Sequence, residues 1–372
     1  MSLDAPGPVA TRGPVRVVGT GLLGASVGLG LATRGVDVVL HDPSRIALAL
    51  ARDVGAGRLP APDDAPVSLV IVAVPPDVTA DVVLAELAAH PGAVVTDLAS
   101  VKGYILDALR VAGADLSRYV GSHPLAGRER SGPAAAVPDL FVGRPWVITD
   151  SGTSEADALL AVRALAADLG GVPVSMDPRD HDAAVAVISH VPQVVASLVA
   201  ARLRDAPAGA LDLSGQGLRD VTRIAASDPA LWTSILAANA REVRDVLVDL
   251  RTDLDTVIDA LAVAGASDAT GDAALGVLAR AIAQGNAGVS RIPGKHGGTP
   301  REYAIVTVLV PDAPGELARL LTDVGAAGVN LEDLQLEHAS GRPVGMAAIS
   351  VLPARAEHLH TELTARGWRL AS

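Results

Sequence analysis

The chain has 372 residues, no cysteine and a formal charge of −12. This length predicts two or three domains. Hydrophobic residues make up 49% and charged residues 19%, so these domains can bury substantial cores. The lack of cysteine excludes disulfides and thiolate metal sites. The acidic balance argues against nucleic acid as a partner.

Two stretches of the sequence bear on where the protein is found in the cell. Residues 1–13 lack the apolar core of a secretory signal and are expected to be disordered. The apolar run 183–201 contains His190, Pro192 and Gln193, whose polar groups would be costly in lipid. We therefore expect a buried helix, no membrane contact and a cytoplasmic protein.

The first strand, turn and helix carry a dinucleotide-binding pattern. A β-rich run at 15–18 leads directly into Gly19-Thr-Gly21-Leu-Leu-Gly24, and a helix follows to about residue 33. In this setting Gly19 permits the tight turn, Gly21 lets a pyrophosphate approach, and Gly24 lets the helix pack on the strand. A glycine-rich turn without a nucleotide is the alternative, but Asp42 after the next strand argues against it. Its carboxylate is expected to bind the ribose of NAD and to repel the phosphate of NADP.

The run 69–74 indicates a buried parallel strand, and 93–97 and 119–121 indicate strand ends that follow it. The runs 145–149 and 172–176 look like further strands. Ligands bind beyond the carboxyl ends of such strands. The residues that follow those ends should therefore converge on the glycine loop. The expected cofactor contacts are Gly19, Gly21, Leu22, Leu23, Gly24, Asp42, Val74, Pro75 and Ser100.

His123 opens a polar, turn-rich segment that extends to residue 132. Pro124 biases His123 toward an extended conformation, which stiffens the backbone that carries the imidazole. An unperturbed pKa of roughly 6.5 suits a general base near neutral pH. Taken alone, the segment favours a hydrogen-bonded loop histidine. The place of the segment after a strand end favours the base.

Residues 179–290 predict a helical domain. The helix at 183–201 carries His190 and Gln193 on one polar face, and Pro192 should kink it. A second long helix is expected from residue 231 to about 261. Arg223 suits carboxylate recognition, although a surface arginine paired with nearby acids is the simpler interpretation of that residue alone. The uniformly apolar helices predict a homodimer.

The pattern changes after a Gly- and Pro-rich linker at 291–301. Residues 302–372 predict a strand at 303–310, a helix at 315–327, strands at 330–337 and 344–352, a helix at 354–366 and a strand at 368–370. This βαββαβ order is the ferredoxin-like arrangement. The complete expectation is an α/β Rossmann domain over 14–178, an all-α domain over 179–290 and a ferredoxin-like domain over 302–372.

Five ordered blocks of this sequence resemble the prephenate/arogenate dehydrogenase family of tyrosine biosynthesis. They are the Gly19 loop, Asp97-Leu-Ala-Ser100-Val-Lys102, the segment 121–132, Ser189-His-Val-Pro192 and the segment 220–232. The helical domain is then similar to that of 6-phosphogluconate dehydrogenases. Residues 302–372 resemble an ACT domain, a module that often binds amino acids.

The resemblance implies NAD-dependent oxidative decarboxylation of prephenate to 4-hydroxyphenylpyruvate. His123 would be the base, and Ser100 would orient its imidazole or the substrate hydroxyl. No metal is implied, because the cofactor accepts the hydride. The implied substrate contacts are Arg223, His190, Gln193 and Glu129. The implied regulatory site for tyrosine comprises Asp312, Gly315 and Asn330, where a helix N-terminus can hold a carboxylate.

Three alternatives stay open at this point. Gln193 stands where many family members have a second histidine, so arogenate competes with prephenate as substrate. A 2-hydroxyacid dehydrogenase of the 6-phosphogluconate type would need a lysine on the middle helices, but there is none between Lys102 and Lys295. A tyrosine sensor with a relic dehydrogenase domain is the third alternative.

Overall fold

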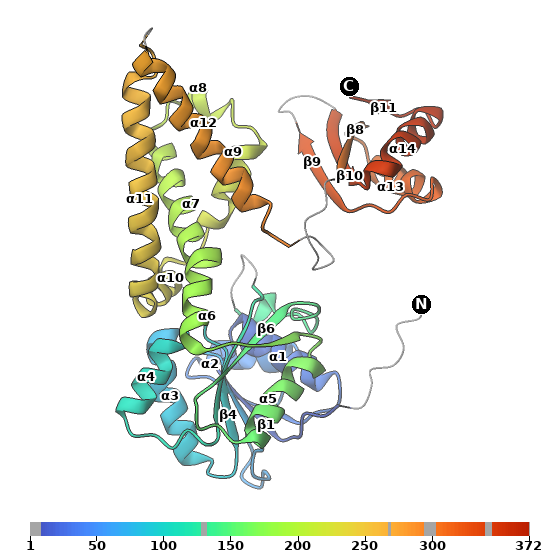
Figure 1. Ribbon diagram of the computed structural model, residues 1–372. Coiled ribbons are helices and arrows are strands. Elements are labelled where there is room, and N and C mark those ends of the chain that lie inside the picture. Colours follow the sequence, from blue (N-terminus) through green and yellow to red (C-terminus); the bar gives the residue numbers. More distant parts are fainter. Residues whose placement is uncertain (1–8, 128–131, 267–268, 294–302, 339–343, 372) are drawn as a thin grey trace. The chain divides into compact units, whose positions relative to one another are not determined.

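The computed structural model describes residues 9–127, 132–266, 269–293, 303–338 and 344–371 (Figure 1). It divides into two compact units. The first comprises residues 1–206 and 221–249, and the second comprises residues 207–220 and 250–372.

A seven-stranded sheet forms the centre of the first unit, in the order β2-β1-β3-β4-β5-β6-β7. Strands β1 to β5 run parallel, β6 pairs with β5 in the antiparallel sense, and β7 is parallel to β6. The carboxyl ends of β1 to β5 therefore share one edge. The strands are Val15–Val18, Val38–His41, Leu69–Val72, Val94–Asp97, Tyr119–Pro124, Pro145–Asp150 and Val172–Ser175.

Helices cover both faces of this sheet (Figure 1). Successive strand residues point to opposite faces, so Val17 packs in one apolar cluster with α1 and α5 and Val18 packs in another with α3 and α4. Burial on both faces explains why the strands are rich in valine. The helices are α1 Leu22–Ala32, α2 Arg45–Asp53, α3 Pro76–Ala89, α4 Gly103–Val111 and α5 Ala156–Asp168, with a 3₁₀ turn η1 at Pro133–Ala135.

The segment before β1 is attached to the end of α5. The backbone N–H and the hydroxyl of Thr11 donate to Asp168 Oδ2 at 2.7 and 2.6 Å, and the N–H of Ala10 donates at 3.1 Å. Thr11 is buried. Residues 9–13 therefore differ from the disorder expected for 1–13, while residues 1–8 lie outside the described part.

The helices that follow the sheet begin with α6 Pro178–Val185, a π-helical turn η2 Ala186–His190 and α7 Val191–Arg202. The π turn ends two residues before Pro192. Proline has no N–H to donate to the carbonyl four residues earlier, and a wider turn accommodates that gap. The first unit also contains the 3₁₀ turns η3 Leu203–Asp205 and η4 Arg223–Ala225, then α10 Pro229–Ala238 and the start of α11 Ala240–Val263.

Pro178–Asp205 is long and apolar enough to cross a membrane, by length and composition only. The expected burial of this segment holds for one face. Val185, Ala186 and Ala196 are buried, whereas Ile188 and Leu198 are exposed. The second predicted helix, 231–261, is broken at Asn239, which separates α10 from α11. The break allows the side chain of Asn239 to contact Asp182 and His190.

The second unit holds a four-stranded antiparallel sheet in the order β11-β8-β10-β9. Its elements confirm the predicted βαββαβ order. Both helices pack on one face, because Leu320 of α13 and Leu359 of α14 join Val308 and Ile349 in one buried cluster. The elements are β8 Ala304–Pro311, α13 Glu316–Ala326, β9 Asp333–His338, β10 Val344–Val351, α14 Pro353–Ala365 and β11 Arg369–Leu370. They follow α8 Ala208–Leu211, α9 Gln216–Thr222, the end of α11 and α12 Ala269–Val289.

Candidate active site

The glycine loop between β1 and α1 has the form that a dinucleotide requires. Gly19 has a φ of +93°, and a Cβ on it would lie 2.4 Å from the carbonyl oxygen of Ala73. A Cβ on Gly24 would lie 1.9 Å from the carbonyl oxygen of Gly19. A Cβ on Gly21, in contrast, would meet nothing within 4 Å. Two glycines therefore make the close turn, and the third leaves open space where a pyrophosphate fits.

The start of α1 offers its own contribution to phosphate binding. Leu22 and Leu23 form its first turn, and Gly21 at the N-cap supplies no side-chain hydrogen bond. The first backbone N–H groups of the helix are therefore available for an anion. Val74 and Pro75 follow β3 beside this loop, and a Cβ on Gly19 would come within 3.0 Å of Val74 Cγ1. The predicted cofactor contacts after β1 and β3 are thus neighbours.

Asp42 directly follows β2 and contacts the glycine loop. Its Oδ2 accepts hydrogen bonds from the N–H and hydroxyl of Thr20 at 2.7 and 2.9 Å, and its Oδ1 accepts from the N–H of Ser44 at 2.8 Å. The carboxylate is thus fixed against the glycine loop. Oδ1 has capacity for a further hydrogen bond, so a ribose hydroxyl still fits there.

His123 lies within β5, at its carboxyl end, rather than in the loop that the sequence predicts. Its Nδ1 is 2.9 Å from Nε2 of His181, and the two rings meet edge to face with centroids 5.1 Å apart. His181 Nδ1 is in turn 2.8 Å from Oδ1 of Asp182. Residues from β5 and α6 therefore form a continuous line of hydrogen bonds.

Asp182 also anchors the start of α4. Its Oδ1 accepts from the N–H of Lys102 at 2.8 Å, and its Oδ2 accepts from the N–H of Gly103 at 2.8 Å. With His181 Nδ1, three nitrogens therefore contact this one carboxylate. The first helix after the sheet is thereby joined to the segment that follows β4.

A buried polar cluster lies directly behind β5. Lys102 Nζ contacts Asp97 Oδ1 and donates to the carbonyl oxygen of Ser122 at 2.7 Å. The hydroxyl of Tyr119 donates to Asp97 Oδ2 at 2.8 Å. Lys102, Asp97 and Tyr119 are all buried. Burial lowers the pKa of Lys102 against the opposing effect of Asp97, and burial beside Asp97 raises the pKa of the Tyr119 hydroxyl well above its usual value.

The surroundings of His123 favour its neutral form. Burial lowers the pKa of His123 well below the usual 6.5, and the nearby His181, Lys102 and His190 act in the same direction. A neutral imidazole has one nitrogen able to accept a proton. The site therefore keeps His123 in the form that a general base needs.

His190 is the second predicted histidine, and it is 1% exposed. Asn239 Nδ2 donates to the carbonyl oxygen of Asp182 at 2.8 Å and lies 3.1 Å from His190 Nδ1. The carbonyl can only accept, so the NH₂ of Asn239 faces both groups and His190 Nδ1 must accept. Burial lowers the pKa of His190 to about 4. His190 is thus a neutral Nε2–H tautomer.

The same contacts explain the break between α10 and α11. Asn239 has a φ of −115° and a ψ of 28° and is buried, because its side chain must reach Asp182 and His190. Trp232 of α10 packs edge-on against His190, with ring centroids 6.0 Å apart. The polar face predicted for the middle helix therefore meets a second helical segment.

Gln193 and Arg223 lie in neighbouring elements. Gln193 of α7 is buried, and its Oε1 accepts from the hydroxyl of Ser227 at 3.4 Å. Arg223 begins η4, which packs against α7, and its side chain is exposed. These two predicted substrate contacts thus belong to one part of the first unit.

Ser100 and Glu129 complete the predicted set. Ser100 is partly buried, and the described residues show no hydrogen bond between it and His123. His181, rather than Ser100, orients the imidazole. Glu129 lies outside the described residues.

Sequence reasoning missed His181, Asp182 and the buried Lys102. A signal for the first two was present. Asp177-Pro178 is a helix start, and its N-cap carboxylate accepts from the N–H of Arg179 at 2.8 Å. That start places His181 and Asp182 in the first turns of α6, next to the strand edge.

The predicted regulatory residues belong to the second unit. Gly315 has a φ of +90° and caps α13, as its position before the helix requires. Asp312 is exposed, and Asn330 Nδ2 donates to Glu332 Oε1 at 2.9 Å.

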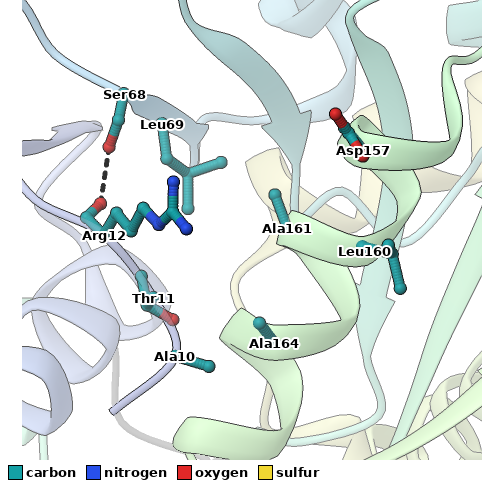
Figure 2. Close-up of a pocket in the computed structure, with 9 residues that line it drawn as sticks. All are labelled: Ala10, Thr11, Arg12, Ser68, Leu69, Asp157, Leu160, Ala161 and Ala164. Atoms are coloured by element: carbon teal, nitrogen blue, oxygen red, sulfur yellow. Dashed lines mark hydrogen bonds between the residues drawn. The ribbon is translucent and has the colours of Figure 1, made fainter.

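A cavity of about 400 Å³ in the first unit lies away from these residues (Figure 2). It adjoins the amino end of β3 and one side of α5, whereas the site above adjoins carboxyl ends. Ser68 donates to the carbonyl oxygen of Arg12 at its rim at 2.5 Å. Its lining residues are Ala10, Thr11, Arg12, Ser68, Leu69, Asp157, Leu160, Ala161 and Ala164.

A Rossmann sheet with a fitted dinucleotide loop, and with a neutral histidine at the carboxyl end of a neighbouring strand, defines an NAD-dependent oxidoreductase. Comparison with known proteins narrows this class. Residues 27–175 match the prephenate dehydrogenase nucleotide-binding domain, and residues 177–270 match the prephenate dehydrogenase dimerization domain. The chain belongs to the prephenate dehydrogenase family.

Individual relatives agree with this assignment. The chain is 40% identical to the probable prephenate dehydrogenase NovF of Streptomyces niveus, over 95% of this chain and 98% of that protein. A crystal structure of prephenate dehydrogenase from A. aeolicus, in complex with hydroxyphenyl propionate and NAD⁺, is 26% identical with a TM-score of 0.60. It covers 76% of this chain and 100% of its own. Synechocystis arogenate dehydrogenase is 28% identical with a TM-score of 0.59, over 74% and 98% of the two chains.

Proposed function

We propose that this protein catalyses the NAD-dependent oxidative decarboxylation of prephenate to 4-hydroxyphenylpyruvate, a step of tyrosine biosynthesis. The observation that carries the proposal is the neutral His123 at the carboxyl end of β5, with His181 on its Nδ1. Family membership and the glycine loop that fits a dinucleotide support it.

Each residue of the site has its own role in the reaction. Bound NAD supplies the hydride acceptor. His123 Nε2 removes the proton of the substrate hydroxyl, since its Nδ1 is already engaged by His181. We assign to Ser100, three residues after β4, a contact with the same hydroxyl. The ring carboxylate leaves as carbon dioxide, and its bonding electrons complete the aromatic ring.

The charged and polar groups of the helices serve substrate binding. Arg223 provides a guanidinium for a substrate carboxylate, and its contribution lies in orientation. Gln193 and His190 line the helical side of the substrate. Glu129 is proposed as a charged group at the mouth of the site.

Arogenate is the second candidate substrate. It differs from prephenate in carrying an amino acid side chain in place of a pyruvyl group. Gln193 can hydrogen-bond to either but carries no charge. The similarity to Synechocystis arogenate dehydrogenase keeps this substrate in the test.

The decisive experiment is NADH formation with prephenate and arogenate in parallel, for the wild type and for His123→Asn. We expect turnover of prephenate, and a loss of about 10²–10⁴-fold in the variant. Turnover of arogenate alone would keep the base and reassign the substrate. No turnover of either, with tyrosine bound, would favour the tyrosine sensor.

We also propose the domain organisation around this site. A Rossmann domain spans 14–178, a helical domain spans 179–290, and a linker at 291–301 leads to an ACT domain at 302–372. The match of residues 177–270 to a dimerization domain supports a homodimer. The βαββαβ sheet supports the ACT assignment. We place the protein in the cytoplasm, in keeping with a biosynthetic dehydrogenase.

Tyrosine is the proposed effector of the ACT domain. Its carboxylate would meet the N-terminus of α13 at the turn from Asp312 to Gly315, with Asn330 alongside. Millimolar tyrosine should lower the rate of prephenate turnover in the wild type. Gly315→Val should abolish that inhibition and leave the uninhibited rate unchanged. Equal rates with and without tyrosine would remove this proposal.

A further inference from the structure

We propose that His181 and Asp182 form a proton relay behind His123, in which His181 receives the proton that His123 draws from the substrate. The inference rests on the proposed function, because it takes His123 as the base. It begins from the line of contacts that joins the three side chains, 2.9 Å from His123 Nδ1 to His181 Nε2 and 2.8 Å from His181 Nδ1 to Asp182 Oδ1.

The contacts of Asp182 determine which nitrogen carries each proton. Its two oxygens accept from the backbone N–H groups of Lys102 and Gly103, so the carboxylate is an acceptor only. His181 must therefore donate from Nδ1, which leaves its Nε2 as an acceptor. His123 must then donate from Nδ1. The remaining nitrogen of His123, Nε2, has a free lone pair for the substrate hydroxyl.

The opposite arrangement would disable the base. If His181 carried its proton on Nε2, His123 Nδ1 would have to accept, and His123 would hold its own proton on Nε2. The carboxylate of Asp182 prevents this arrangement. An aspartate sets the tautomer of the catalytic histidine in serine proteases in the same manner, where Asp→Asn costs roughly 10⁴ in rate.

The proton balance of the reaction fits a relay that stores a proton and returns it. The hydroxyl O–H bond breaks and an Nε2–H bond forms on His123, while the Nδ1–H bond of His123 breaks and an Nε2–H bond forms on His181. Loss of carbon dioxide leaves an aromatic oxyanion. The proton then returns along the same two bonds to that oxygen, so the reaction as a whole releases no proton.

The contacts around the relay give the proton a direction, from His123 toward His181. His123 lies near the cation Lys102, which itself contacts the carboxylate of Asp97. His181 instead contacts the carboxylate of Asp182 directly. The remaining charged pair near the start of α6 is Arg179 with Asp107 of α4, 3.8 Å apart and exposed to solvent, where it acts weakly.

The tautomers can be measured without turnover. Selective ¹⁵N labelling of histidine, with His123→Gln and His181→Gln used for assignment, reports which nitrogen of each imidazole is protonated. We expect Nδ1–H on both His123 and His181, and Nε2–H on His190. An Nε2–H tautomer on His181 in the wild type would overturn the proposal.

The kinetic test uses His181→Gln. Glutamine can accept the hydrogen bond from His123 Nδ1 but cannot take a proton, so it separates orientation from proton storage. We expect kcat to fall by about 10²-fold, in line with a lost acid–base group. The KM for prephenate should change little, because glutamine keeps the hydrogen bond that orients His123. His360→Gln, an exposed histidine of α14, should change neither kcat nor KM.

Two outcomes separate this proposal from the proposed function. A His181→Gln variant with wild-type kcat would overturn the relay and leave prephenate turnover standing. A wild type that turns over neither substrate would overturn the proposed function, while the ¹⁵N measurement would still decide the tautomers. NADH binding and the urea midpoint confirm that the variant is folded.

Discussion

The buried, neutral histidines of this site make the folding stability of the protein depend on pH. The pKa of His190 is lowered to about 4 by burial, below the roughly 6.5 of an unfolded chain. Between these values the unfolded chain binds more protons than the folded protein. Folding stability should therefore fall as the pH drops from about 6.5 toward 4, by up to about 1.4 kcal/mol per pH unit for such a group.

His190→Gln tests this dependence, because glutamine keeps an acceptor for Asn239 but does not titrate. Urea unfolding at about pH 7.5 and about pH 5 should show a smaller loss of stability in the variant than in the wild type. Some loss should persist, because His123 is shifted in the same direction. An unchanged loss would show that His190 is not the titrating group. His360→Gln is the control.

We propose that Asp42 sets a preference for NAD over NADP. Its carboxylate is fixed by Thr20 and Ser44 directly after β2, where the proposed site holds the adenine ribose, and its charge would oppose a ribose phosphate. Asp42→Asn should lower kcat/KM for NAD⁺ and raise it for NADP⁺, each by about tenfold, equivalent to roughly 1.4 kcal/mol. Asp37→Asn, which removes an exposed acid paired with Arg58, should leave the ratio unchanged. Equal effects of the two variants would contradict this role.

The turn between β1 and α1 permits a matched comparison of glycines. Gly21→Ala adds a methyl group to open space, so the fold should be retained while NAD⁺ binding weakens. Gly24→Ala forces a contact with the Gly19 carbonyl at 1.9 Å, so stability itself should fall. The urea midpoint and the Kd for NADH separate the two effects. A Gly21→Ala variant with wild-type NADH affinity would show that the pyrophosphate does not approach there.

The elements themselves show what a sequence can predict. The parallel strands β1 to β5 are short apolar runs with turn residues at their ends, and local pattern suffices to locate them. No local pattern records that β6 runs antiparallel to β5. The break at Asn239 arises because its amide reaches Asp182, 57 residues earlier in the chain. Contacts of this kind are decided by tertiary structure.

The residues of the candidate site were likewise only partly predictable from the sequence. His123 could be predicted because a strand end, a proline and a histidine coincide within a few residues. His181 and Asp182 could not be assigned a role, because their partners lie on β5 and before α4. The helix start at Asp177-Pro178 was visible, but only the fold brings that start to the strand edge.

At the scale of the whole molecule, the base and its support come from different segments of the first unit. His123 belongs to the sheet, whereas His181 and Asp182 begin the helices that follow it. Asp182 therefore has two functions, since it sets the tautomer of His181 and joins α6 to the start of α4. Asp182→Asn should lower both activity and stability, whereas His181→Gln should lower chiefly activity. Comparing kcat with the urea midpoint for the two variants checks this division.

Helices α11 and α12 expose rows of apolar side chains. On α11, Leu254 and Ile258 are 55% and 53% exposed and lie one turn apart, within the region that matches a dimerization domain. On α12, Leu275, Ile282 and Val289 are exposed at intervals of seven residues, which places them on one face of the helix. Apolar side chains in such numbers are typical of an interface between subunits.

Introducing charge on α11 should separate the subunits. Burying a carboxylate without a partner costs several kcal/mol, and a symmetric dimer suffers each substitution twice. The double variant Leu254→Glu, Ile258→Glu should therefore be a monomer by light scattering at micromolar concentration, where the wild type is a dimer. Val111→Glu is the matched control, because Val111 is 90% exposed at the end of α4 in the Rossmann sheet layer. That variant should remain a dimer, and a dimeric double variant would place the interface elsewhere than on α11.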